Sequence, residues 1–359
     1  MTRLLMAADA VGGVWQYATE LAVALAPFGI ETILAVVGPT DALPDSDDQR
    51  FRIIRTGLPL DWLAEDEEAV IAAGHAVAKL ARQVGADLVH LNSPALAAQA
   101  EFDMPVAAVA HGCIGTWWQA ARGTAPDADF AWSVALTSAG LAAADAVVAP
   151  SAAFAETVAR VHALPALPLV VHNGRTPLAL PDAAPADTVF TAGRLWDEVK
   201  NIPLLDRVAA RVPVPFRAAG PLAGPHGEGI AVHHLDTPGP LSEAELAAIL
   251  ATRPIYVSAA RFEPFGLSVL EAAAAGCPLV LSNIDTFREL WTGAALLVPV
   301  DDEVAYVAAI ERTRTDPTLR AHLGEAARLR AARYTPEAMA GAMAAIYAGL
   351  TATDRRAAA

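Results

Sequence analysis

The chain has 359 residues, 54% of them hydrophobic, and a formal net charge of −15. This length suits two domains of ordinary size, with enough apolar residues to bury a core in each. The acidic balance argues against a nucleic-acid partner and against docking on anionic membranes, because no basic stripe or cluster is available to neutralise phosphates.

The first half of the chain alternates apolar, strand-like runs with amphipathic helical stretches. We predict strands at 3–8, 32–37, 88–91, 106–110, 146–149 and 169–172, and helices at 14–26, 67–84, 133–143 and 152–161. This alternation is typical of a parallel, doubly wound α/β sheet with right-handed crossovers.

Residues 176–187 interrupt the pattern, because they are rich in proline and lack a helical period, so we predict an interdomain hinge there. A second βα series follows it. We predict strands at 189–192, 216–219, 255–258 and 279–282, helices at 201–211, 243–250, 268–275, 302–313, 317–333 and 337–350, and a frayed end at 351–359. The predicted domains are therefore 1–178 and 186–334.

Two cysteines, Cys113 and Cys277, lie far apart and without the spacing of metal ligands. A disulfide framework is therefore excluded and a reducing compartment is expected. The N-terminus predicts a first strand and its turn, not a secretory signal, and no apolar run of about 18 residues predicts a transmembrane anchor. We expect a cytoplasmic protein.

The polar and glycine-rich positions follow the predicted strands. In open α/β sheets, ligands bind beyond the carboxyl ends of the strands. The positions in question are Asp9 with Gly12-Gly13, His111-Gly112, Asn173-Gly174, Gly193-Arg194, Gly220-Pro221 and Glu263. Two such sheets facing each other would place all of these around one cleft.

The stretch Glu263-Pro-Phe-Gly-Leu-Ser-Val-Leu-Glu271 carries two carboxylates where a loop turns into a helix. Pro264 and Gly266 resist helix, so we expect Glu263 on the loop and Glu271 on the second or third helical turn. A helix N-terminus suits phosphate or sugar hydroxyls, and a carboxylate beside it can accept two hydrogen bonds from vicinal hydroxyls. The alternative for Glu271 is a helix-face salt bridge. A glycosidase is rejected, because both carboxylates lie on one short element.

A basic element, Gly193-Arg-Leu-Trp-Asp-Glu-Val-Lys-Asn201, follows a strand and opens a helix. Arg194 and Lys200 could clamp a diphosphate, the first through its fork and the second as a point charge. Lys200 is one of two lysines among 25 basic residues, which lowers the odds of a chance surface charge. The alternative is a solvated loop whose charges pair with Asp197 and Glu198.

Three features of the first half of the chain could contact a ligand, but each also has an ordinary structural interpretation. Gly12-Gly13 before a helix lets the backbone approach a phosphate, but alone it is a common tight turn, and the absence of G-x-G-x-x-G disfavours a nicotinamide enzyme. His111 could bond to a sugar hydroxyl, move a proton, or serve as a structural histidine. Trp117 and Trp118 could stack on an acceptor or pack in the core.

Taken together, these segments resemble family 4 of the retaining glycosyltransferases, which have the GT-B fold. The stretch 263–271 is similar to the E-x7-E signature of that family. The other matching segments, in chain order, are 12–22, His111-Gly112, 171–174, 192–195 with Lys200-Asn201, 219–221 and 239–246. The resemblance covers nearly the whole chain, and it implies two Rossmann-like, doubly wound domains facing across a cleft. It also implies that the helix at 337–350 crosses back and completes the first domain.

The resemblance also implies a role for each matching position. Glu271 would bind the ribose hydroxyls, and Glu263 would lie beside the donor sugar. Arg194 and Lys200 would stabilise the diphosphate as negative charge grows on the leaving group. The remaining implied contacts are Phe265, Gly266, Leu267 and Ser268 with the donor, Gly12 and Gly13 over the diphosphate, His111 near the anomeric carbon, and Asn92, Trp117 and Trp118 on the acceptor side.

The implied enzyme is a hexosyltransferase that moves a sugar from a nucleotide-diphosphate sugar to an acceptor hydroxyl by same-face displacement, with retention. No cofactor and no metal are expected, because the basic pair replaces the metal. The acceptor, whether a saccharide, a lipid-linked group or a small molecule, is open. The alternatives are a phosphorylase or epimerase of the same fold, with Lys200 as its pyridoxal lysine, and a non-catalytic nucleotide-sugar sensor.

The chain departs from the family pattern at four points. Pro264 stands where many members have glycine, and His172 replaces the usual proline before Asn-Gly. Arg175 follows that Asn-Gly pair. The spacing from Arg194 to Lys200 is one residue longer than in many members, which leaves open the phosphate that Lys200 would reach.

Overall fold

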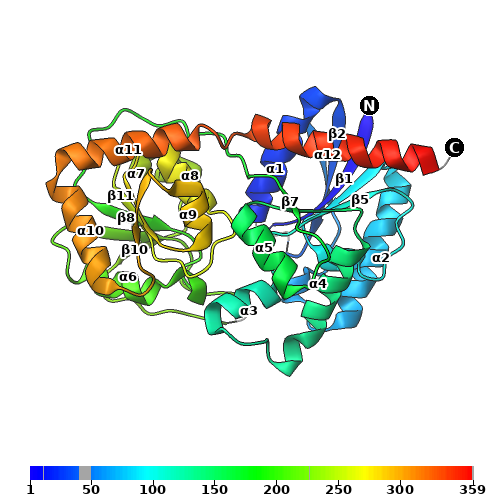
Figure 1. The fold of residues 1–359 in the computed structure, drawn as a ribbon, viewed down its shortest axis with the longest axis horizontal. Coiled ribbons are helices and arrows are strands. Elements are labelled where there is room, and N and C mark those ends of the chain that lie inside the picture. Colours follow the sequence, from blue (N-terminus) through cyan, green and yellow to red (C-terminus); the bar gives the residue numbers. More distant parts are fainter. Residues whose placement is uncertain (11, 40–49, 226, 358–359) are drawn as a thin grey trace. The chain divides into compact units, whose positions relative to one another are not determined.

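The computed structural model describes residues 1–10, 12–39, 50–225 and 227–357. The chain forms two compact units, Met1–Gly174 with Thr335–Ala359, and Arg175–Tyr334 (Figure 1). Each unit is an α/β structure built on its own sheet, so both predicted βα series exist.

The described part of the first unit contains a parallel sheet in the order β3-β2-β1-β4-β5-β6-β7. Its strands are β1 (Thr2–Asp9), β2 (Ile30–Val37), β3 (Phe51–Arg55), β4 (Leu88–Leu91), β5 (Val106–Val109), β6 (Ala146–Ala149) and β7 (Leu169–Val170). Its α-helices are α1 (Gly13–Leu25), α2 (Glu67–Val84), α3 (Ile114–Arg122), α4 (Ala131–Ala143), α5 (Ala152–Val161) and α12 (Pro336–Ala357). Strands β2 and β3 lie on one side of β1, and β4 and the later strands lie on its other side. The switch point of the sheet is therefore between β1 and β4.

The described part of the second unit contains a parallel sheet in the order β10-β9-β8-β11-β12-β13. Its strands are β8 (Val189–Ala192), β9 (Phe216–Ala219), β10 (Asp236–Gly239), β11 (Ile255–Ser258), β12 (Leu279–Ser282) and β13 (Ala295–Val298). Its α-helices are α6 (Ile202–Ala209), α7 (Glu243–Ala251), α8 (Leu267–Ala274), α9 (Asp285–Trp291), α10 (Glu303–Thr315) and α11 (Pro317–Ala331). The switch point of this sheet lies between β8 and β11.

Each sheet buries its own apolar core. In the first unit, Leu4 and Met6 of β1 pack with Tyr17 of α1 and with Met343 and Tyr347 of α12. Residues of the last helix therefore belong to the core of the first unit.

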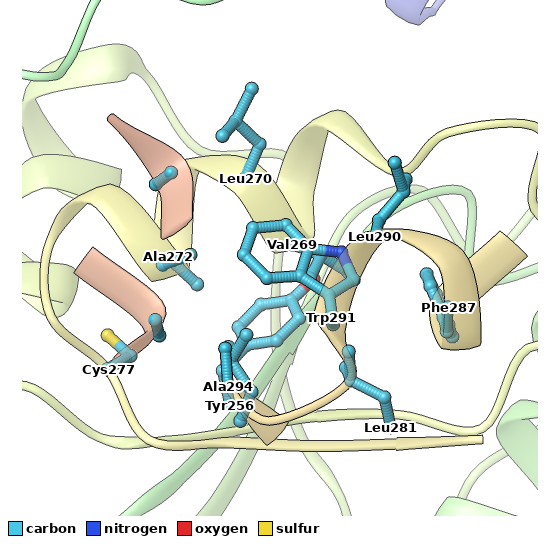
Figure 2. Close-up of a cluster of buried hydrophobic side chains, with 14 of the residues drawn as sticks. Tyr256, Val269, Leu270, Ala272, Cys277, Leu281, Phe287, Leu290, Trp291 and Ala294 are labelled. Atoms are coloured by element: carbon cyan, nitrogen blue, oxygen red, sulfur yellow. The ribbon is translucent and has the colours of Figure 1, made fainter. Parts of the chain in front are cut away.

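The second unit has two buried apolar clusters, one that includes residues of α8 and α9 and one that includes residues of α6 and α10. Figure 2 shows the indole of Trp291 at the centre of the first of these clusters, with Phe287 on one side and Ala272 and Cys277 on the other. Removing these side chains from water is the main stabilising contribution to the unit, at about 25 cal/mol for each Å² of apolar surface buried. The same packing holds α8 in place behind its loop.

One predicted feature at the end of the chain is wrong. Residues 351–359 were expected to fray, but α12 continues to Ala357, and residues 358–359 lie outside the described part of the chain. The hydroxyl of Thr351 donates to the carbonyl oxygen of Tyr347 at 3.1 Å, and that of Thr353 donates to Gly349 at 3.0 Å. These two side-chain hydroxyls thus bond to carbonyl oxygens one turn earlier in the continued helix.

The proline-rich segment 176–187 contains no helix or strand, and its end is bonded within the second unit. The backbone N–H of Ala186 donates to the carbonyl oxygen of Thr252 at 2.8 Å. Asp187 forms ion pairs with Arg314 at 3.5 Å and with Arg320 at 3.4 Å. Its role as a hinge stays a prediction. Among the described residues, no helix combines the length and the apolar character that a membrane span requires.

Candidate active site

Several predicted site residues follow the strands that flank the two switch points. In the second unit, Arg194 follows β8 and Glu263 follows β11. In the first unit, Gly12 follows β1 and Asn92 follows β4. Strand connections diverge at a switch point and leave a crevice in which ligands of open α/β sheets bind.

The loop that carries Glu263 is shaped by Gly266. This residue is the N-cap of α8 and has φ +95°, a left-handed conformation that glycine adopts without strain. An added Cβ would lie 3.2 Å from Cγ of Glu263 and 3.3 Å from Cε1 of Phe287. Glycine therefore lets the loop close tightly over the helix start. Glu263 lies on the loop and Glu271 on the second turn of α8, so the predicted placement of both is confirmed.

Lys200 and Glu263 form an ion pair within this site. The ammonium nitrogen Nζ of Lys200 lies 2.6 Å from Oε2 of Glu263, and the two side chains are only 20% and 15% exposed. Lys200 ends a short 3₁₀ helix (Glu198–Lys200), and the backbone N–H of Arg261 donates to the carbonyl oxygen of Val199 at 2.8 Å. The backbone thus ties the loop after β8 to the loop after β11.

Arg194 pairs with Asp197, three residues further along the chain. The distance between Nη2 of Arg194 and Oδ2 of Asp197 is 2.8 Å. Arg194 is 42% exposed whereas Asp197 is 2% exposed, so the carboxylate is the anchored partner. The guanidinium carbon also lies 5.7 Å from the ring centre of Trp196, within cation–π range. The alternative interpretation, in which the basic residues pair with carboxylates of their own loop, therefore holds for Arg194. Lys200 pairs with Glu263 on another loop.

The turn before Arg194 requires glycine at position 220. Gly220 has φ +137°, and an added Cβ would lie 1.8 Å from the carbonyl oxygen of Gly193. The backbone N–H of Gly193 donates to Ala219 at 3.0 Å, and that of Gly220 donates to Gly239 at 2.9 Å. These contacts hold the ends of β8, β9 and β10 together and fix the point from which Arg194 projects.

Glu271 has an ionic partner that the sequence did not predict. Nε of Arg175 donates to Oε1 of Glu271 at 2.9 Å, and the Glu271 side chain is only 8% exposed. The same guanidinium lies 3.7 Å from Glu243. The one available sign was that Arg175 follows the Asn-Gly pair of the resembling segment, a departure to which no role was given.

Tyr256 is bonded to two elements of this site, the end of β8 and the start of α8. Its hydroxyl donates to the carbonyl oxygen of Ala192 at 3.3 Å and is also bonded to the side chain of Ser268. Burial raises the pKa of Tyr256, and the nearby carboxylates of Glu263 and Glu271 raise it further. The phenol therefore stays protonated and serves as a donor. It links the strand that precedes Arg194 to the first turn of α8.

A second polar cluster lies at the switch point of the first unit. Oδ1 of Asn92 lies 2.7 Å from Nε2 of His111 and 3.0 Å from Nε2 of His90. Nδ1 of His90 lies 2.6 Å from the hydroxyl of Tyr347. The Tyr17 ring packs edge-on against His111, with ring centres 4.5 Å apart.

The histidines of this cluster are shifted towards the neutral form. Burial lowers the pKa of His90 to about 4. Burial and the adjacent His90 lower the pKa of His111 to about 3. Prediction from the sequence found His111 and Asn92 but missed His90 and Tyr347; the available sign for His90 was a polar residue inside an apolar strand, two positions before Asn92.

The remaining predicted residues of the first unit lie at the start of α1 or on α3. Gly12 is the N-cap of α1 with φ +83°, and Gly13 is the first residue of that helix. Trp118 is buried against Phe130, with ring centres 5.4 Å apart, which favours the core alternative for this residue. Trp117 is half-buried on the same helix. Whether any of them contacts a ligand stays a prediction.

In the second unit, three predicted donor residues therefore lie in two ion pairs, Lys200 with Glu263 and Glu271 with Arg175, which was not predicted. The predicted Arg194 pairs with Asp197 instead. In the first unit, two predicted residues, Asn92 and His111, lie together in one polar cluster. Among the described residues, no three histidine, cysteine or carboxylate side chains come together as a metal site would require.

Comparisons with known proteins agree with the resemblance. Residues 11–176 match the family model described as Glycosyltransferase Family 4, and residues 231–330 match that described as Glycosyl transferases group 1. The glycogen synthase of Mycobacterium tuberculosis is 25% identical over 96% of this chain and 93% of its own.

Two solved structures are similar over nearly their whole length. Sucrose-phosphate synthase from Thermosynechococcus elongatus has a TM-score of 0.81 at 22% identity and covers 98% of this chain and 100% of its own. The Anabaena protein HepE, solved in complex with UDP-glucose, has a TM-score of 0.74 at 17% identity with the same coverage. These likenesses show that the two sheets form the GT-B fold.

Proposed function

Because the chain is a family 4-like glycosyltransferase, we propose that it moves a sugar from a nucleoside-diphosphate sugar to an acceptor hydroxyl with retention of configuration. The observation that carries this proposal is the pairing of Lys200 with Glu263 and of Arg175 with Glu271 at the switch point of the second sheet. The site holds cations for a diphosphate and carboxylates for sugar hydroxyls within one short stretch of loop and helix.

The donor would be held by the start of α8 and by the loop after β8. Glu271 would accept hydrogen bonds from the ribose hydroxyls, with Arg175 orienting its carboxylate. Glu263 would accept from hydroxyls of the transferred sugar, beside the backbone of Phe265, Gly266 and Leu267. The tight Gly266 turn supports this assignment, because it brings backbone close to the ligand without a side chain in between.

In the proposed reaction, the bond between the anomeric carbon and the leaving phosphate oxygen breaks, and the acceptor oxygen bonds to the same face of that carbon. The acceptor proton passes to the departing phosphate oxygen. Arg194 and Lys200 would stabilise the negative charge that grows on the diphosphate, a role in which preorganised charges lower the barrier strongly. The proposal needs no metal for this step, since the two cations take its place.

We propose UDP-glucose as the first donor to test, because HepE was solved with UDP-glucose. The acceptor is proposed only as a hydroxyl compound. A pyridoxal-dependent phosphorylase is disfavoured, because the ammonium of Lys200 is engaged by Glu263 and so is suited to act as a charge.

A panel of UDP-, GDP- and ADP-sugars tests the proposal, read by thermal shift and by release of nucleoside diphosphate. One donor is expected both to raise the melting temperature and to be hydrolysed slowly without acceptor. Stabilisation with no release, even with acceptors present, would favour the nucleotide-sugar sensor. No response to any donor would contradict the proposal.

A further inference from the structure

The buried side chain of Asn92 is held in one orientation by the neighbouring strand. Its side-chain Nδ2 donates to the carbonyl oxygen of Ala7 at 3.0 Å, and its backbone N–H donates to the same oxygen at 3.2 Å. Only the NH₂ group of the amide can donate to a carbonyl. The amide oxygen Oδ1 must therefore face away from β1, towards the two histidine rings.

This orientation fixes the position of the protons on both rings. Oδ1 of Asn92 is an acceptor only, and Nε2 of His111 and Nε2 of His90 lie 2.7 and 3.0 Å from it. Both Nε2 atoms must then carry a hydrogen. A neutral His90 with its hydrogen on Nε2 has a lone pair on Nδ1, which accepts from the Tyr347 hydroxyl at 2.6 Å. The order of donation is Tyr347 to His90, and both histidines to Asn92.

We propose that Asn92, supported by His90 and Tyr347, is a positioning residue that holds His111 as a neutral imidazole with an unprotonated Nδ1, which accepts a hydrogen bond from a substrate hydroxyl. This inference rests on the proposed function, since it assigns a chemical role to a predicted contact of the transferase. It limits the ligand class at this point to a group with a hydrogen to donate, such as a sugar hydroxyl. A phosphate or carbonyl oxygen would meet a lone pair.

The surroundings of the rings keep them uncharged. Burial lowers the pKa of His111 to about 3 and that of His90 to about 4, so both are neutral from about pH 5 upward. The titratable groups shown to face the rings from other elements are Tyr17 of α1 and Tyr347 of α12. Burial raises the pKa of both phenols, so neither supplies a negative charge that would favour an imidazolium.

Two catalytic roles are thereby removed from His111. It carries no proton on Nδ1 to give to a leaving group, and its low pKa makes it a weak base for taking one. The remaining role is to orient a substrate hydroxyl. A substrate that lacks this hydroxyl would leave Nδ1 without a partner and would therefore bind more weakly. Because Tyr347 lies on α12, the final helix of the chain takes part in setting the state of this ring.

The direct test uses the full-length protein with ¹⁵N-labelled histidine. The His111 signals, identified by their loss in His111→Gln, are expected to show a pyridine-type Nδ1 and a pyrrole-type Nε2, with no titration between pH 5 and pH 8. A pyrrole-type Nδ1, or titration within that range, would overturn the inference. This readout needs no turnover, so it stays informative even if the proposed reaction is wrong.

Asn92→Asp provides the matched variant, because it keeps the shape and places a carboxylate between the rings. A carboxylate favours the charged imidazolium and raises the pKa of His111. In this variant, kcat/KM is expected to fall at acid pH, by about tenfold for each pH unit below the raised pKa of His111. The fall occurs because Nδ1 becomes protonated and can no longer accept a hydrogen bond. The parent enzyme is expected to show no such fall above pH 5. The inference would be overturned if NMR showed the raised pKa of His111 in Asn92→Asp while the variant and the parent enzyme had identical pH profiles of kcat/KM. That result would show that Nδ1 contacts no substrate hydroxyl.

Discussion

Nζ of Lys200 lies 2.6 Å from Oε2 of Glu263, although the two residues are 63 positions apart in the chain. The pair joins the loop after β8 to the loop before α8, so it belongs to both halves of the candidate donor site. Without substrate, each charge compensates the other. In the proposed reaction the diphosphate would attract Lys200 and the sugar hydroxyls would attract Glu263, so the two charges serve stability and function at the same position.

The contribution of this pair to stability can be measured by a double-mutant cycle. Lys200→Met and Glu263→Gln are each expected to lower the free energy of unfolding by about 1–3 kcal/mol, because the remaining group is largely buried without its partner. The double variant should cost about 1–2 kcal/mol less than the sum. Urea unfolding of the four proteins measures the coupling.

The control for that cycle is the exposed pair Arg217–Asp236, whose atoms lie at a similar distance of 2.9 Å. Its coupling energy is expected to stay below about 1 kcal/mol, because solvent screens exposed charges. Equal coupling in the two pairs would show that the partial burial of Lys200 and Glu263 has no energetic consequence.

Arg175 is expected to support nucleotide binding through Glu271. Arg175→Met removes the guanidinium that orients a nearly buried carboxylate, and the Kd for a nucleoside diphosphate should rise about tenfold, or about 1.4 kcal/mol. Glu271→Gln should raise it at least as much. Isothermal titration calorimetry gives both values. An unchanged or tighter Kd in Arg175→Met would mean that the arginine competes with the nucleotide for Glu271.

Gly220 is expected to be essential for the turn before Arg194. Gly220→Ala would place Cβ within 1.8 Å of a backbone oxygen at φ +137°, so we expect a loss of at least about 3 kcal/mol in the free energy of unfolding. Gly229→Ala is the matched control in the same unit, since the nearest atom lies 3.9 Å away, and it should change stability by less than about 0.5 kcal/mol. A Gly220→Ala protein as stable as this control would contradict the described turn.

Both thiols are expected to be slow to react in the folded protein. Burial raises the pKa of Cys277 to about 12 and also raises that of Cys113, while the thiolate is the reactive form. At pH 8, Ellman's reagent should modify both much more slowly than a free thiol and should count two after unfolding. Rapid modification of the folded chain would refute this.

These raised thiol pKa values also set the direction of a pH effect on stability. The folded state keeps both thiols protonated, whereas the unfolded thiols ionise at about pH 8.5. Their contribution to the free energy of unfolding is thus fully present below that pH and is lost as the pH rises towards 12. Cys277→Ser should reduce the alkaline loss of stability; an unaltered pH dependence would assign that loss to other groups.

Prediction from the sequence succeeded where the information is local. Pro264 and Gly266 resist helix, and the apolar run after them repeats with the helical period, so the loop and the position of Glu271 on α8 followed from nine residues. Strands with continuous apolar runs, such as β11 and β12, were found for the same reason.

Elements with weak local patterns were missed. β3, β10 and β13 were not predicted. β3 has two adjacent isoleucines between arginines, and β10 contains proline and glycine. β13 is a short apolar run and was missed in spite of that pattern. α3 was missed because Gly115 and the two tryptophans lower its helix propensity. Its start is fixed by a capping box in which the Cys113 side chain accepts from the Thr116 backbone.

The ionic partners in the site could not be predicted, because they depend on strand order. Lys200 meets Glu263 only because β8 lies beside β11, and His90 meets Tyr347 across 257 positions because the last helix returns to the first unit. Sequence alone fixes neither pairing. It did place Arg194, Lys200, Glu263 and Glu271 within one unit.

The most direct test of the central claim is release of nucleoside diphosphate from the donor identified in the panel, compared between the parent protein and Lys200→Met. The control is Arg207→Met, which removes an exposed basic residue of α6 in the same unit. We predict that Lys200→Met slows release at least about 100-fold, because it removes a charge aimed at the leaving group, and that the control changes it little. Equal rates in Lys200→Met and the parent protein would contradict the account.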